Sequence, residues 1–410
     1  MNELQHGYQI MWQTVAQLGG ISSVGVSLYY LWKYFHPEEE PPEELEKLDN
    51  FFENINFRAK DKEGNSVNPY LINHEKYDNG NLFIYTIPNG RSISELKKKQ
   101  EALSHSLKGE VEIWNRHNRA FIRSYTEKVE NKIYFDKKFM LDQLANAQLG
   151  LPIGYSHKGF IMHDLSKHPG HMAVGGTTRY GKSNLIDMMI TCLLLGYNPD
   201  KVLLNLLDYK NGVEFQDFCD FPHIMNYSEN PNEVELIFEE LKKELVSRMK
   251  LVKKFNKKNV NGLNIPYIIT FIDEIAVLHG NKDALDDLTY LTQQGAAAGL
   301  FFVISTQRPE VKYVPGAIKT NCDTRISLKM ISSTDSKTIL DNGLAAELPP
   351  IPGRAIYQHG EPVELQVPFM QNEKEDDTLI KELLEQRMEE LAHKKGLPED
   401  IETEWRLEVL

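Results

Sequence analysis

Cysteine is scarce in this chain, which carries Cys192, Cys219 and Cys322 in 410 residues. They lie far apart and form no Cys-x-x-Cys pair, so neither a disulfide scaffold nor a cysteine-based zinc site is encoded. This usage predicts a reducing cytoplasm as the compartment. The hydrophobic share of 41% and the charged share of 26% exclude collagen-like and wholly disordered classes, and the length predicts about two or three domains.

Positive charge is also in short supply, because 46 Lys and Arg face 59 Asp and Glu, giving a formal net charge of −13. Two acidic stretches, residues 38–49 and 372–410, account for the whole excess, so the remaining chain is close to neutral. A globally acidic chain is not one coated in nucleic acid. Charges act over about 8–10 Å in salt, however, so a locally basic channel remains compatible with this balance.

The N-terminal region lacks any charged side chain between Leu4 and Trp32. Residues 15–32 approach the roughly 20 apolar residues that a membrane span needs, and an aromatic and cationic edge follows. Since no basic start and no small-residue cleavage site are present, residues 1–35 are predicted as an uncleaved membrane-anchor helix. A buried or oligomerising helix is the alternative. Residues 36–50 are predicted as an acidic, solvated linker.

The remaining chain changes its periodicity twice. Residues 51–140 contain short strands around one helix, which predicts a small α+β domain. Residues 141–370 alternate apolar strands with helices, which predicts an α/β domain with a parallel sheet covered on both faces. Residues 371–410 are predicted as an acidic helical tail that packs on the surface. The strands predicted for the α/β domain are residues 171–175, 202–208, 267–273, 300–306, 324–330 and 354–357.

The strongest motif is Gly-Thr-Thr-Arg-Tyr-Gly-Lys-Ser, which matches GxxxxGK[ST] between a predicted strand and a helix. Its glycines let backbone N–H groups surround phosphates, and the helix N-terminus adds the positive end of its dipole. Lys182 is expected to reach the β- and γ-phosphates and Ser183 to bind Mg²⁺, so ATP and Mg²⁺ are the predicted cofactors. The predicted nucleotide-binding residues are Gly176, Thr177, Thr178, Arg179, Tyr180, Gly181, Lys182 and Ser183.

Two further predicted strands end in polar side chains. Asp273 and Glu274 follow the strand that begins near residue 267, and we expect Asp273 to hold Mg²⁺ and Glu274 to orient and deprotonate the attacking water. An isolated Asp-Glu after a strand is usually a helix cap, but the phosphate-binding motif favours hydrolysis here. Gln307 follows the next strand, where it either senses the γ-phosphate or bonds to loop backbone.

These blocks, in their order and spacing, resemble the FtsK/SpoIIIE family of DNA-translocating motors over about residues 56–358. The segments that carry the resemblance are HMAVGGTTRYGKS, LLDYK with FPHI, FIDE, GAAAGLFFVISTQRP, PGAIKTNCDTRISLKMISSTDSKTILD and GRAIYQ. The resemblance implies a RecA-like P-loop NTPase core, a homo-oligomeric ring that is usually a hexamer, and ATP-driven movement along double-stranded DNA. It also implies that Lys182, Asp273, Glu274 and Gln307 are catalytic.

The resemblance assigns DNA contact to Arg308, Lys319 and Lys337, although each could be an ordinary solvated base. Contacts to phosphates without base readout make binding sequence-tolerant and steeply salt-dependent. The chain departs from the family pattern in several places. Residues 295–299, around Ala296, lack the arginine finger that members offer to a neighbour's ATP, so either Arg325 or Arg354 substitutes or hydrolysis is slow.

Three other departures narrow the expected function. Arg179 and Tyr180 replace small residues inside the phosphate loop, the chain ends in an acidic helix instead of a basic winged-helix domain, and it has at most one membrane span. We therefore expect a ring ATPase tethered to the inner face of a bacterial membrane. It would move plasmid or conjugative-element DNA as a coupling protein, with a relaxase or transfer-channel proteins as partners.

Two alternatives come from other functional classes. One is a secretion-type ring ATPase that translocates or recruits protein substrates. The other is a nucleotide-gated membrane scaffold that binds ATP and scarcely hydrolyses it, against which the intact Glu274 argues.

Overall fold

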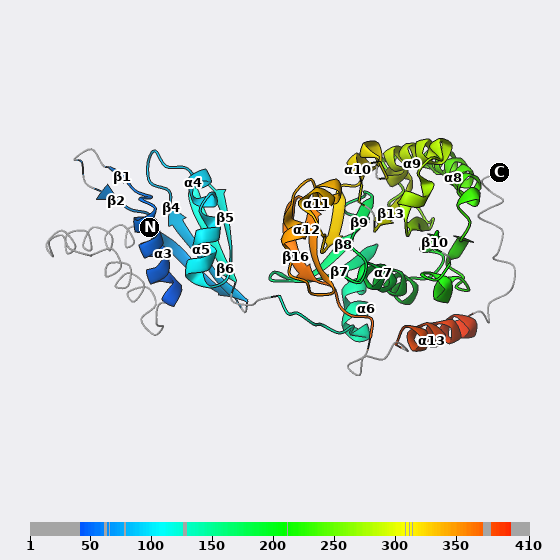
Figure 1. Ribbon diagram of the computed structural model, residues 1–410, viewed down its shortest axis with the longest axis horizontal. Helices are drawn as coiled ribbons and strands as arrows, with labels where there is room; N and C mark the ends of the chain where they lie inside the picture. The colour runs from blue at the N-terminus through cyan, green and yellow to red at the C-terminus, as the bar shows by residue number, and fades with distance from the viewer. Residues whose placement is uncertain are drawn as a thin grey trace. The chain divides into compact units, whose positions relative to one another are not determined.

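The computed structural model describes residues 42–60, 64, 66–77, 79–125, 129–210, 212–307, 309–310, 312–313, 315–371 and 379–394. The chain divides into two compact units, residues 1–128 and 129–410, which are described separately (Figure 1). The predicted anchor in residues 1–35 lies outside the described residues. Within the described part of the chain, no helix has the length and apolar character needed to cross a membrane.

The first unit is built on a four-stranded antiparallel sheet in the order β3-β4-β6-β5, and its helices share one hydrophobic core with the sheet. Residues 43–50, which the charge pattern assigned to a linker, instead form the first part of helix α3. Leu45, Leu48 and Phe52 recur on one face of that helix and are buried in the core. The elements are α3 (Glu43–Asn54), β1 (Ala59–Lys60), β2 (Ser66–Val67), β3 (Leu71–Tyr77), β4 (Gly80–Thr86), α4 (Ile93–Lys97), α5 (Gln100–Leu107), β5 (Glu110–Arg116) and β6 (Arg119–Tyr125).

The second unit contains a ten-stranded sheet in the order β11-β10-β12-β13-β9-β14-β15-β16-β7-β8. The strands from β11 to β14 in this order run parallel, as predicted, and the remaining pairs are antiparallel. The strands are β7 (Gly150–Ser156), β8 (Gly159–Asp164), β9 (Met172–Gly175), β10 (Val202–Leu207), β11 (Ile224–Ser228), β12 (Tyr267–Ile272), β13 (Leu300–Thr306), β14 (Thr324–Leu328), β15 (Arg354–His359) and β16 (Glu361–Gln366).

The strand predicted at residues 354–357 is part of β15, and the expectation that it runs parallel was wrong. Leu328 at the end of β14 pairs with Ala355 near the start of β15, so β15 begins beside the end of β14 and runs back in the opposite direction. Two short helices, α11 (Ser333–Leu340) and α12 (Leu344–Glu347), make this connection. To run parallel to β14, β15 would have to start beside the beginning of β14. The chain would then need a crossover back along the length of the strand, which α11 and α12 do not provide.

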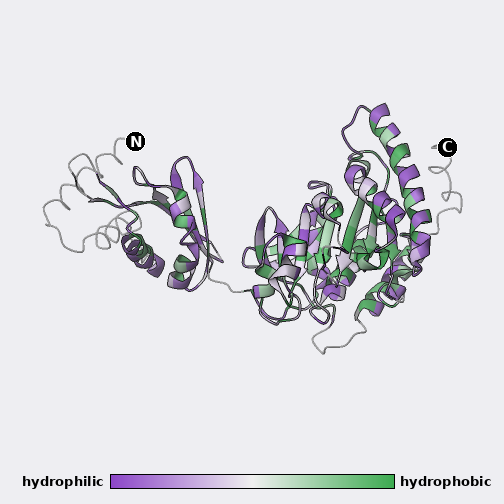
Figure 2. Cartoon of the chain, turned by 45° about the horizontal axis from the view of Figure 1, so that its top comes forward, coloured by the Kyte–Doolittle hydropathy of each residue, from purple (hydrophilic) through white to green (hydrophobic). Residues whose placement is uncertain are grey.

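Helices cover both faces of this sheet. α7 (Lys182–Gly196) packs into one hydrophobic core, whereas α8 (Val234–Lys254) and α9 (Lys282–Gln294) pack into the core on the opposite face. Figure 2 shows the hydrophobic colouring concentrated in the central strands, with hydrophilic residues on the outward side of the helices. The other helices are α6 (Lys137–Ala145), α10 (Gly316–Asn321) and α13 (Leu379–Lys394), with 3₁₀ turns η1 (Gln216–Phe218), η2 (Pro231–Glu233), η3 (Ile275–Leu278) and η4 (Gly295–Ala298).

The described part of the predicted tail, α13, packs against the core of the second unit. Leu383 and Leu384 are buried there, and the Arg387 guanidinium donates to the carbonyl oxygens of Leu194 (2.9 Å) and Tyr197 (3.0 Å). These carbonyls lie at the C-terminal end of α7, where helical carbonyl groups lack partners within the helix. α13 therefore fixes the far end of the helix that begins at the phosphate-binding motif.

Candidate nucleotide site and basic groove

The phosphate-binding motif connects β9 to α7. Gly181 adopts a left-handed φ of 96°, a conformation that glycine reaches without steric cost, and α7 begins at the next residue. Arg179 also has a positive φ, 74°, which is unusual for a residue with a side chain. The predicted loop therefore has the strand-loop-helix setting that a phosphate cradle requires, with one strained position inside it.

Lys182 and Asp273 form a buried ion pair at the carboxyl ends of β9 and β12. Lys182 is 4% exposed and Asp273 is 1% exposed, and the ammonium donates to the Asp273 carboxylate and to Ser305 Oγ (3.0 Å). The second carboxylate oxygen of Asp273, Oδ2, is buried without a hydrogen-bond partner. Lys182 thus rests on the acidic residue that is predicted to hold the metal.

Glu274 is held by groups at the end of the neighbouring strand β13. Its carboxylate accepts hydrogen bonds from Thr306 Oγ1 (2.6 Å) and from the backbone N–H of Gln307 (2.9 Å). The side-chain oxygen of Gln307 in turn accepts from Thr178 Oγ1 in the phosphate loop (3.0 Å). Gln307 therefore connects the phosphate loop to Glu274, through its side-chain oxygen on one side and its backbone N–H on the other.

The residues present suit a magnesium ion. The hydroxyl of Ser183 and the free oxygen of Asp273 are the hard oxygen donors that this ion prefers. In the described part of the chain, no three His, Cys, Asp or Glu side chains are arranged to hold a metal by themselves. Magnesium takes one or two protein oxygens in many nucleotide sites and completes its shell with water and nucleotide.

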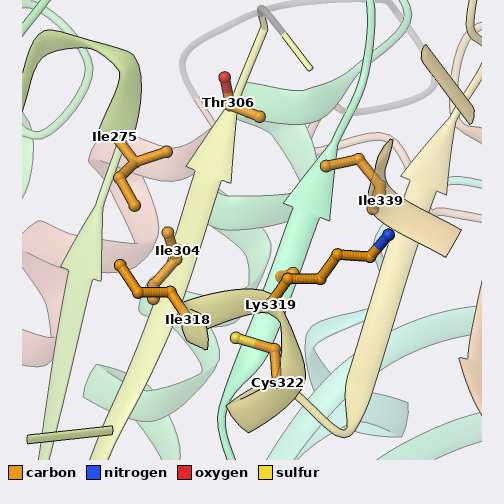
Figure 3. Close-up of a pocket in the computed structure, with 8 residues that line it drawn as sticks. Ile275, Ile304, Thr306, Ile318, Lys319, Cys322 and Ile339 are labelled. Carbon is orange, nitrogen blue, oxygen red and sulfur yellow. The ribbon is translucent and has the colours of Figure 1, made fainter. Parts of the chain in front are cut away.

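A pocket of about 10 Å³ is lined by Ile304, Ile318 and Ile339, and Thr306 lies at its edge on the carboxyl end of β13 (Figure 3). That space holds about one water molecule. The phosphate loop itself faces outward, since Thr178 and Arg179 are both exposed.

Two of the three residues predicted to contact DNA lie among the described residues. Arg308 lies outside the described residues. Lys319 and Lys337 line one groove of about 400 Å³ between α10 and α11, and Arg325 also lines it. Lys319 donates to Asp341 Oδ1 (2.6 Å) and to the carbonyl oxygen of Lys337 (2.8 Å), so part of its charge is balanced within the chain.

The two arginines considered as substitute fingers are bonded within their own unit. The Arg325 guanidinium pairs with Asp341 and donates to the carbonyl oxygen of Cys322 (3.0 Å). Arg354 is buried and donates to Glu364 Oε1 and Asn131 Oδ1 (2.8 Å each). Both guanidinium groups are therefore engaged within the second unit of this chain.

Several polar residues at this edge escaped the sequence analysis. Ser305 and Thr306 contact the two acidic residues, and their position directly before Gln307 was the available signal. Glu214 lies four residues after the LLDYK segment, and its carboxylate accepts from Lys210 Nζ (2.6 Å).

A parallel sheet whose central strand leads through a glycine-rich loop into a helix, with an acid pair at the end of a strand one place removed in the sheet, defines a P-loop NTPase. The FtsK/SpoIIIE family model matches residues 136–348, about half of the chain. The chain therefore belongs to the FtsK/SpoIIIE family.

Curated relatives agree with this assignment. The chain is 34% identical over 223 residues to the DNA translocase FtsK of Helicobacter pylori strain J99, which covers 51% of this chain and 26% of that protein. It is 32% identical over 276 residues to FtsK of Clostridium tetani (63% and 37%), and 31% identical over 228 residues to the DNA translocase SpoIIIE of Bacillus subtilis (51% and 29%). The chain thus spans between about a quarter and somewhat over a third of these relatives' lengths.

Solved structures share the fold. The pCW3 conjugation coupling protein TcpA, solved with ATPγS, has a TM-score of 0.56 and 22% identity, covering 83% of this chain and 99% of that one. ATPases 2 and 3 of EssC from Geobacillus thermodenitrificans have a TM-score of 0.57 and 19% identity, covering 66% and 53%. The type VII secretion ATPase EccC of Thermomonospora curvata has a TM-score of 0.52 and 22% identity, covering 58% and 31%.

Proposed function

We propose that this protein is an ATP-driven motor that moves double-stranded DNA and serves as a coupling protein in plasmid or conjugative-element transfer. The observation that carries the proposal is the convergence of Lys182, Asp273 and Glu274 at the carboxyl ends of β9 and β12, which flank β13, inside the segment that defines the family. We place the protein at the inner face of the membrane through residues 1–35, and we propose a ring assembly, a hexamer by analogy with the family.

The buried ion pair supports an exchange on nucleotide binding. Lys182 leaves Asp273 for the phosphates, and Asp273 is then free to face the metal with its otherwise unpartnered oxygen. The metal, when bound, neutralises charge on the phosphates during transfer. Because Lys182 moves between two anionic partners, its charge stays compensated in both states.

Glu274 has the acceptor oxygens that a water-activating residue needs. The Thr306 hydroxyl and the backbone N–H of Gln307 orient its carboxylate. The side chain of Gln307 is hydrogen-bonded to Thr178 in the phosphate loop. In this proposal, a displacement of the phosphate loop on nucleotide binding moves the Gln307 side chain, and Gln307 in turn contacts Glu274. Glu274 orients a water and takes its proton.

The groove between α10 and α11 supports the DNA part of the proposal. Lys319, Arg325 and Lys337 line it with the single acid Asp341, so it keeps a positive charge in a chain that is acidic overall. Such a site binds phosphates without reading bases. A DNA phosphate would compete with Asp341 for Lys319.

Steady-state ATP hydrolysis by the full chain, with and without long linear duplex DNA over a protein concentration series, tests this function. We expect DNA to stimulate turnover cooperatively with protein concentration, and Glu274→Gln to bind ATP without turnover. Stimulation by a polypeptide and not by DNA would favour the secretion-type alternative. ATP binding with no stimulated turnover would favour the scaffold alternative.

A further inference from the structure

The phosphate loop carries an arginine at a position that favours glycine. The backbone N–H of Tyr180 donates to the carbonyl oxygen of Thr177 (3.3 Å), which closes a four-residue turn. Arg179 is the third residue of this turn and has a φ of 74°. Turns with a positive φ at the third residue favour glycine there, because a side chain strains that backbone conformation. Such strain is typical of functional positions, so the Arg179 side chain is a candidate for a role in the site.

The surrounding structure holds this turn in place. The backbone N–H of Thr177 donates to the carbonyl oxygen of Lys329 (3.2 Å), and the carbonyl oxygen of Tyr180 accepts from the backbone N–H of Gly353 (2.9 Å). The Tyr180 side chain packs against the same hydrophobic core as α7. The loop is therefore fixed through the residues on either side of Arg179, and the strained residue keeps its conformation.

The guanidinium of Arg179 is available to an anion. Arg179 is exposed, and nothing in the described part of the chain bonds to its side chain. The other arginines described in the second unit are engaged. Arg325 pairs with Asp341 and Arg354 with Glu364. The remaining two, which are buried and donate to backbone carbonyl oxygens, are Arg248 and Arg387.

The position of Arg179 suits the charge that phosphoryl transfer develops. It lies on the loop whose backbone N–H groups would surround the phosphates, three residues before Lys182. A guanidinium stays charged at any working pH and presents a planar fork of donors that matches phosphate oxygens. An arginine that contacts the transferred phosphoryl group stabilises its transition state, whether it comes from the same subunit or from a neighbour.

We propose that Arg179 is a catalytic residue that supplies in cis the charge of the arginine finger missing at residues 295–299. The inference rests on the proposed ATPase and names the residue that stabilises the γ-phosphoryl group as it is transferred. It also explains why the turn keeps an arginine where glycine would relieve the backbone. Fingers of this kind are worth about 10³–10⁵ in turnover.

Arg179→Gly tests the role without disturbing the loop, because glycine adopts a φ of 74° more readily than arginine. In the full chain, we expect turnover to fall by about 10³-fold. Binding is measured separately with fluorescent ADP, with and without aluminium fluoride, which with ADP mimics the transferred phosphoryl group. We expect the affinity for ADP alone to stay unchanged and the tightening by aluminium fluoride to be lost. Arg179→Lys keeps a charge and should recover part of both losses.

Lys108→Gly is the matched control, since it replaces another exposed cation with a positive φ (57°) and lies in the first unit. Its turnover should equal that of the wild type. Turnover of Arg179→Gly equal to that of the wild type would overturn the inference, and so would an equal loss of affinity for ADP with and without aluminium fluoride.

Mixing two variants tests whether Arg179 acts in cis. Arg179→Gly and Glu274→Gln subunits are combined at several ratios. If Arg179 serves its own nucleotide, no mixture contains a complete site, and turnover never exceeds that of Arg179→Gly alone. Recovered turnover in the mixtures would show action on a neighbour's nucleotide and overturn the assignment in cis. A wild type that binds no nucleotide would instead overturn the ATP site itself.

Discussion

Removing Lys182 should destabilise the nucleotide-free protein, because Asp273 would be left as a buried charge without a cation. Asp273 is 1% exposed, its Oδ2 atom has no partner, and Ser305 would be its remaining side-chain donor. Breaking a buried ion pair by deleting one partner costs about 3–5 kcal/mol. Lys182→Met keeps the aliphatic stem and deletes the charge, so it should lose an amount in that range.

Hydrogen exchange measured by mass spectrometry on peptides from α7 and β12 reports this loss in the second unit alone. A loss of about 3–5 kcal/mol corresponds to exchange between about 10² and 10⁴ times faster, since 1.4 kcal/mol is tenfold. The double variant Lys182→Met with Asp273→Asn removes both charges and should restore most of the protection. If Lys182→Met were as protected as the wild type, the proposed transfer of Lys182 from Asp273 to the phosphates would be refuted. A double variant as unstable as the single variant would refute it as well.

Three further predictions concern other parts of the chain. Burial raises the pKa of Asp49 to about 7, so unit 1 loses stability as pH rises from about 4 to 7; Asp49→Asn should stabilise it by up to about 4 kcal/mol at pH 8 and not at pH 4, in urea-dependent pulse proteolysis. Arg387→Met removes the bonds to the carbonyls of Leu194 and Tyr197, of which Tyr197 keeps a bond from His223 Nε2 (3.0 Å), and should lower the free energy of unfolding by roughly 1–3 kcal/mol; an unchanged thermal midpoint would contradict the role of α13. Lys337→Gln should reduce the slope of log DNA affinity against log salt by about one, and an unaltered slope removes it from the DNA path.

The sequence was most informative where function depends on local geometry. The phosphate loop needs a strand, glycines and a helix within a few residues, so its pattern is complete in residues 171–183. The side chains of Asp273, Glu274 and Gln307 could be placed on one sheet edge because parallel strands end together. The structure brings these residues to the predicted edge.

Other features depend on contacts that no local pattern encodes. The ion pair between Lys182 and Asp273 joins residues that are distant in sequence, and the fold of the loop after β10 depends on the burial of Asp208. The antiparallel direction of β15 depends on the connection through α11 and α12, which brings the start of β15 beside the end of β14. The charge of residues 43–50 concealed the apolar stripe of α3, because composition averages over the helix faces that burial separates.

Movement along duplex DNA is the activity that a DNA motor must show. A linear duplex carrying a third strand bound as a triplex near one end is incubated with the full chain, and release of the third strand is followed with and without ATP. The account predicts release that requires ATP, increases cooperatively with protein concentration, and is abolished in Glu274→Gln. ATP hydrolysis by the wild type without release at any protein concentration would contradict a DNA motor.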